Sequence, residues 1–169
     1  MTTLSHPAIA LAVGAFSEDG RAARFVAAID RDDTVVVLVA STSPFDSDSE
    51  VRGLMFVDHD GAQWRLPGVS VVSGSPCRHT TRAATTRAAW PLEDKRTRSY
   101  CRADGEICWF GLTGYAAEDA VAVTVVSSVS SDRVEVGADG LVLAAVRARP
   151  GETPVVIVHL ATGENLVAP

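Results

Sequence analysis

The chain contains 169 residues, of which 47% are hydrophobic, and a chain of this length can bury roughly 70% of its unfolded surface around one core. Its 21 acidic and 15 basic residues give a net charge of −6, which argues against attraction of the whole surface to nucleic acid or to anionic lipid. The chain has no apolar run of about 20 residues, so no membrane-spanning helix is expected.

The first apolar segment, AIALAVGAF at residues 8–16, is predicted to be a β-strand. It differs from a signal peptide because no Lys or Arg precedes it and no small-residue cleavage site separates it from the acidic residues that follow. The default expectation for the compartment is therefore the cytoplasm. The extracellular space or a virion is the alternative, because three cysteines in a small β-domain also suit an oxidising compartment.

Four Asp-Gly pairs predict hairpin turns, because both central residues of such a turn need positive φ. Between them lie short segments rich in valine, some alternating with period 2 and some continuous, which are typical of β-strands. Together they predict one all-β domain over residues 1–169, an antiparallel β-sandwich of roughly ten to thirteen strands. The predicted turns are at 19–20, 60–61, 104–105 and 139–140, and the predicted strands include 21–30, 34–41, 51–58, 62–66, 69–72, 119–127, 133–136, 141–148 and 154–160.

Residues 73–99 interrupt the strand pattern with a long polar insertion, which is predicted to be a loop or a short helix. Its middle, TTRAATTRAAW, has the composition of two or three helical turns ended by Pro91, and an ordered loop is the alternative. The insertion is therefore expected to lie on one side of the predicted sandwich.

Arginine is concentrated in and just after this insertion, and Lys95 is the only lysine of the chain, a bias that indicates a GC-rich bacterial genome. Arginines interleaved with aromatic residues suit a docking surface for an acidic protein partner, or a groove for single-stranded nucleic acid. They also suit a solvated loop that pairs with the acidic remainder of the chain. The candidate interaction residues are Arg78, Arg82, Arg87, Trp90, Arg96, Arg98, Tyr100 and Arg102.

The stretch YCRADGEICW predicts a hairpin in which Cys101 lies opposite Cys108 and Tyr100 lies opposite Trp109. Directly opposed residues are close enough for a disulfide, and two free, buried thiols are the alternative. A third possibility is a zinc site that adds Cys77 and His79 to the two cysteines of the hairpin, but the spacing differs from that of zinc ribbons. No cofactor is predicted.

The segment VDHDGAQW brings Asp58, His59 and Asp60 together, but strand alternation places the two carboxylates on one face and the histidine on the other. The sequence contains neither a G-x-S-x-G nucleophile elbow nor a phosphate-binding G-x-x-x-x-G-K loop. An enzyme is therefore not favoured. A small hydrolase or metalloenzyme centred on Asp58, His59 and Cys77 is kept as an alternative.

The C-terminal third carries a resemblance to a known class of domain. The order of CWFGLTGYA, DAVAVTVV, RVEV, DGLVLAAV and PVVIVHLATGENL resembles the last strands of immunoglobulin-like β-sandwich domains in actinobacterial extracellular or membrane-anchored proteins of unassigned activity. The resemblance covers about 60 residues and implies an immunoglobulin-like sandwich. Those proteins usually carry a signal peptide or a membrane span, and the N-terminus of this chain departs from them in showing neither pattern.

The leading functional prediction is a non-catalytic module for protein binding or assembly, such as a subunit of a homomeric or virion-like structure. It depends on the lack of a reactive group of residues and on the Arg, Trp and Tyr of the insertion. The first alternative is a nucleic-acid or polyanion binder that uses the same basic residues over 73–102.

Overall fold

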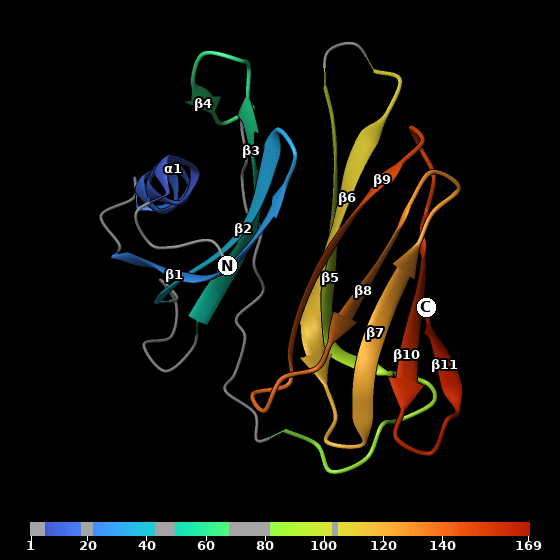
Figure 1. Ribbon diagram of the computed structural model, residues 1–169. Coiled ribbons are helices and arrows are strands. Elements are labelled where there is room, and N and C mark those ends of the chain that lie inside the picture. Colours follow the sequence, from blue (N-terminus) through green and yellow to red (C-terminus); the bar gives the residue numbers. More distant parts are fainter. Residues whose placement is uncertain (1–5, 18–21, 43–49, 68–81, 103–104) are drawn as a thin grey trace. The chain divides into compact units, whose positions relative to one another are not determined.

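The computed structural model describes residues 6–17, 22–42, 50–67, 82–102 and 105–169. The chain divides into two compact units, an N-terminal unit (residues 1–80) and a C-terminal unit (residues 81–169), and each is described by itself. Both are built mainly from antiparallel β-sheets, which confirms the all-β prediction (Figure 1). The prediction of one domain across residues 1–169 stays a prediction.

The N-terminal unit is a four-stranded antiparallel sheet with one helix against it (Figure 1). The strand order is β1-β2-β3-β4, and β2 pairs along its whole length with β3, from Thr34 opposite Asp58 to Thr42 opposite Glu50. Every residue of β2 from Thr34 to Ser41 is buried, as its continuous apolar run predicts. The elements are α1 (Pro7–Phe16), β1 (Ala23–Arg31), β2 (Thr34–Thr42), β3 (Glu50–His59) and β4 (Trp64–Arg65).

The prediction of a strand at residues 8–16 is wrong, because Pro7–Phe16 is the helix α1. Pro7 lies in the first turn, where its missing N–H costs nothing, and the ring of His6 accepts a hydrogen bond from the N–H of Ala8 at 3.2 Å. The buried residues Ala8, Ile9 and Ala12 follow a helical spacing and pack against the valines of β2. An alanine-rich, uniformly apolar segment contains no period-2 signal, so packing against the sheet decides its conformation.

The C-terminal unit is a β-sandwich of two antiparallel sheets around one core. One sheet has the order β5-β6-β9 and the other the order β11-β10-β7-β8. Phe110 and Leu112 of β6 share a buried cluster with Val123 of β7, Val146 of β9 and Val158 of β10, so both sheets contribute to the core. The strands are β5 (Leu92–Cys101), β6 (Cys108–Ala116), β7 (Ala120–Val126), β8 (Ser131–Glu135), β9 (Leu141–Ala148), β10 (Val155–Leu160) and β11 (Asn165–Ala168).

Side chains beside β8 close one edge of this sandwich. The N–H of Ala145 donates to Oδ2 of Asp132 at 3.0 Å, and the N–H of Arg147 donates to Oγ of Ser130 at 2.9 Å. The hydroxyl of Ser127 donates to the carbonyl of Arg147. These bonds satisfy backbone groups on the outer edge of β9, which would otherwise be open to pairing with another strand.

The predicted insertion at 73–99 is shorter than expected and contains no helix among its described residues. Residues 73–81, and the strand predicted at 69–72, lie outside the described residues, and residues 82–91 form turns and irregular backbone. Residues 92–101 form β5, an edge strand in which charged and polar residues alternate. An edge strand carries few apolar residues, so its sequence resembles that of a loop until its partner β6 is known. In the described residues no helix has the length and apolar character needed to cross a membrane.

Candidate ligand-binding pocket

Arg82 is an internal anchor of the C-terminal unit. Its Nε–H donates to the carbonyl of Ala116 at 2.9 Å, and its Nη2 donates to the carbonyl of Ala117 at 2.8 Å. Its Nη1 reaches the carbonyls of Gly137 at 3.3 Å and Ala138 at 3.2 Å. With all three of its nitrogens occupied by backbone carbonyls, this guanidinium binds the segment at 82–91 to the sandwich instead of facing a partner.

Asp119 holds the same segment from the other direction. The N–H of Thr86 donates to Oδ1 of Asp119 at 2.8 Å, and the hydroxyl of Thr86 donates to the same oxygen at 2.6 Å. The hydroxyl bond, followed by the backbone N–H bond, holds the pKa of Asp119 below the ordinary aspartate range. The segment that leads to Trp90 is therefore fixed at Arg82 and at Thr86.

Trp90 ends a tight turn and lines a pocket. The backbone N–H of Trp90 donates to the carbonyl of Arg87 at 3.0 Å, and Pro91 follows with its fixed φ. The indole of Trp90 is 70% exposed, which is unusual for the largest apolar side chain. The pocket has a volume of about 450 Å³, which lies within the range of small-ligand sites, and it is lined by Arg87, Trp90, Pro91, Leu92, Glu93, Asp94, Lys95, Ala168 and Pro169.

Three charged side chains at this pocket have no partner among the described residues. The side chains of Arg87, Glu93 and Lys95 make no hydrogen bond or ion pair there, whereas Asp94 accepts from Nη2 of Arg96 at 2.9 Å. The pocket therefore combines an apolar floor at Pro91 and Leu92 with charges of both signs. This combination suits a ligand that presents both apolar surface and polar atoms.

Three other residues of the predicted patch lie along β5. Arg96, Arg98 and Tyr100 share one face of the strand, because they alternate in its sequence and pair with Thr113, Gly111 and Trp109 of β6. Arg96 is paired with Asp94, and burial lowers the pKa of Arg98. Arg102 follows the end of β5, and Arg78 lies outside the described residues. Of the eight predicted residues, Arg87 and Trp90 line the pocket, and a single interaction patch formed by all eight stays a prediction.

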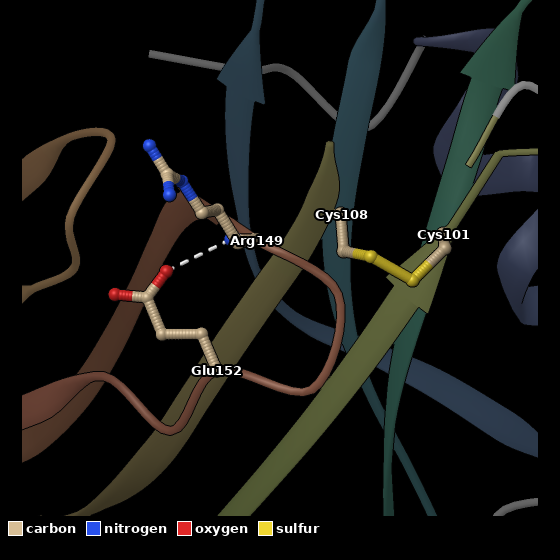
Figure 2. The surroundings of a disulfide bond; sticks show 4 residues. All are labelled: Cys101, Cys108, Arg149 and Glu152. Carbon is tan, nitrogen blue, oxygen red and sulfur yellow. Dashed lines mark hydrogen bonds between the residues drawn. A yellow bond between two sulfur atoms is a disulfide. The ribbon is translucent and has the colours of Figure 1, made fainter. Parts of the chain in front are cut away.

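The hairpin at the other end of β5 has the predicted register, with Cys101 opposite Cys108 and Tyr100 opposite Trp109. A disulfide joins Cys101 to Cys108, whose Cα atoms are 4.1 Å apart (Figure 2). That spacing is nearer to the narrow pairs of an antiparallel ladder than to the wide pairs that a two-residue turn would place here. The strands end at the two cysteines, and the N–H of Gly105 donates to the carbonyl of Arg102 at 2.9 Å.

The disulfide is incompatible with the predicted zinc set. Zinc binds thiolates, and neither sulfur of a disulfide is a thiolate. Cys77 and His79, the other two members, lie outside the described residues.

Figure 2 shows Arg149 and Glu152 in a turn beside the disulfide, where the N–H of Arg149 donates to Oε2 of Glu152 at 2.8 Å.

The acidic residues of the β3-β4 hairpin hold the local structure of the N-terminal unit. Asp58 accepts from the hydroxyl of Thr34 at 2.7 Å, and Asp60 accepts from the N–H of Gln63 at 2.9 Å. Bonds from the N–H groups of Gln63 and Ala62 hold the pKa of Asp60 below the ordinary range. His59 packs its ring edge-on against Trp64, with ring centres 4.9 Å apart. The predicted catalytic set also needs Cys77, which is outside the described residues, so the enzyme alternative stays a prediction.

Glu93 and Lys95 line the pocket although neither is among the eight candidate interaction residues, which are all arginines or aromatic residues. The hairpin register could have located this strand only in part. It carries the pairing from Cys101 back to Arg96, opposite Thr113, but a register shift between Glu93 and Arg96 then places Glu93 opposite Tyr115. A comparison with protein-family models finds no match, and comparisons with curated proteins and with solved structures find none either.

Proposed function

We propose that the protein is a non-catalytic module for protein binding, and that it binds its partner at the pocket beside Trp90. The observation that carries this proposal is an indole that is 70% exposed and lines a pocket of about 450 Å³. Exposing so much apolar surface to water is unfavourable, and a partner that covers it recovers that free energy. Tryptophan and arginine are also the side chains that most often dominate the energetics of protein interfaces.

A protein partner is better supported than a polyanion. Arg82 is occupied by backbone carbonyls and Arg96 by Asp94, so two of the cations that would track phosphates already have other bonds. Glu93 and Asp94 line the same pocket as Arg87 and Lys95, so the pocket does not present the uniformly positive surface that binds phosphates. An immunoglobulin-like topology and a role as a subunit of a larger assembly are compatible with this function, but no contact at the pocket argues for either.

The proposal can be tested by selecting peptides from a random display library on the full chain. We expect enriched peptides that lose binding to Trp90→Ala, because truncating a central aromatic anchor removes about 2 kcal/mol or more. Val155→Ala is the matched control, since it also shortens an exposed apolar side chain of the C-terminal unit but does not line the pocket. A selection that yields only peptides indifferent to Trp90→Ala would refute the proposal.

A further inference from the structure

We propose that the segment bound at this pocket is proline-rich, adopts the polyproline II conformation and carries a basic residue at one end. This inference rests on the proposed function and names the class of partner that the same site recognises. It depends on three features of the pocket: the face of the indole, the excess of donors without a described acceptor, and the one side-chain carboxylate without a described partner.

Trp90, Pro91 and Leu92 supply an apolar surface of the right kind for proline. A large, flat indole offers its face to a pyrrolidine ring, and a rigid ring loses little conformational entropy when it becomes ordered. Polyproline II segments are recognised in aromatic-lined grooves because the conformation is already formed before binding. The bonds at Arg82 and Thr86 and the turn from Arg87 to Trp90 fix the backbone that carries the indole without the partner.

The free hydrogen-bonding groups at the pocket are mostly donors. The indole N–H of Trp90, the guanidinium of Arg87 and the ammonium of Lys95 have no acceptor among the described residues. A polyproline II segment makes no internal hydrogen bonds, so its carbonyls are available, and proline has no N–H that would need an acceptor. A ligand with many acceptors and few donors is therefore the best match to this site.

Glu93 is the one side-chain carboxylate of the pocket without a described partner, because Asp94 is paired with Arg96. A carboxylate beside an apolar groove favours a cation at one end of the bound segment. We therefore expect the segment to bind in one orientation, with its basic end beside Glu93. An acidic residue at that end would meet the same carboxylate and would be disfavoured.

The test is a titration of the full chain with synthetic peptides, followed by calorimetry. The probe is a proline peptide of about ten residues with an arginine at one end, and the control is a Gly/Ser peptide of the same length with the same arginine. We expect the Gly/Ser peptide to bind at least about tenfold more weakly, because its flexible chain loses more entropy on binding. Trp90→Ala should weaken the proline peptide by about thirtyfold, and Val155→Ala should leave its affinity unchanged.

Glu93→Gln tests the direction of the segment with little change in side-chain volume. It should remove most of the preference for a peptide ending in arginine over the same peptide ending in glutamine. If the proline and Gly/Ser peptides bind equally, or if library peptides that depend on Trp90 lack proline, this inference is wrong and the proposed function stands. If no peptide depends on Trp90, both are wrong.

Discussion

Arg82 and Arg87 occupy equivalent places in the two copies of the repeat TTRAA, yet the fold uses them in different ways. Arg82 meets four backbone carbonyls at the end of the sandwich, whereas the side chain of Arg87 has no partner among the described residues and lines the pocket. The difference is not visible in the sequence, because it depends on carbonyls of Ala116 and Gly137 that are distant along the chain. Charge and residue type therefore identified candidates but could not separate an anchor from a side chain that lines the pocket.

Gly140 provides a prediction at the scale of single residues, because its backbone has positive φ and its surroundings leave no room for a side chain. Its φ is +73°, and a Cβ atom would lie 2.7 Å from the carbonyl oxygen of Ala116 and 2.8 Å from Nε of Arg82. We expect Gly140→Ala to lower the free energy of unfolding by about 2–4 kcal/mol, the sum of left-handed strain and a forced shift of the Arg82 anchor. Chemical denaturation would measure it.

Gly151→Ala is the matched control for that prediction. Gly151 has nearly the same φ, +75°, but a Cβ atom added there would have no neighbour within 4 Å. Its substitution should cost about 1–2 kcal/mol, from backbone strain alone. Equal losses for the two variants would show that the contact with Arg82 and Ala116 contributes nothing.

At the scale of elements, the hairpin formed by β5 and β6 shows what turn chemistry and register can predict. The Asp-Gly signal and the symmetry of YCRADGEICW gave the correct opposition of the cysteines and of the aromatic residues. The strand signal is lost before Tyr100, because charged residues of an edge strand do not alternate with apolar ones clearly enough to be recognised. The prediction for α1 failed for a related reason, since an apolar segment without periodicity suits a helix and a strand equally.

The disulfide of this hairpin gives a prediction about the thiols. Of three cysteines, only Cys77 should react with a thiol reagent in denaturant without reductant, and all three should react after reduction. Reduction should lower the free energy of unfolding by about 2 kcal/mol, because the closed loop is short and the strand pairing already restricts it. Cys77→Ser should leave no reactive thiol before reduction. Three reactive thiols in the protein without reductant would contradict the bond.

At the scale of the whole molecule, the two units have separate cores. Ile9, Val37 and Met55 belong to the cluster of the N-terminal unit, and Phe110 and Val158 belong to that of the C-terminal unit. The sequence predicted one domain because composition and turn signals are similar along the chain. Composition and turn signals do not indicate which strands pair with one another, and the division of the chain into two units depends on that pairing.

We expect residues 81–169 expressed alone to fold, because both sheets and the whole core of the sandwich lie within them. The fragment should show the circular dichroism of β-structure and one cooperative unfolding transition on heating. The variant Leu112→Ala of the same fragment should melt at a lower temperature, since it leaves a cavity at a fully buried position and costs about 2–5 kcal/mol. A fragment without a cooperative transition would contradict an independent core.

The sequence by itself determined the all-β class, most strand positions and the register of the cysteine hairpin. These depend on local information, namely the period of apolar residues and the φ that a turn requires. Only the tertiary structure decided that residues 7–16 are a helix, that Arg82 is an anchor, and that Trp90 lies over a pocket with Glu93 and Lys95. Each of these depends on which distant backbone groups and side chains come into contact, and a local pattern does not carry that information.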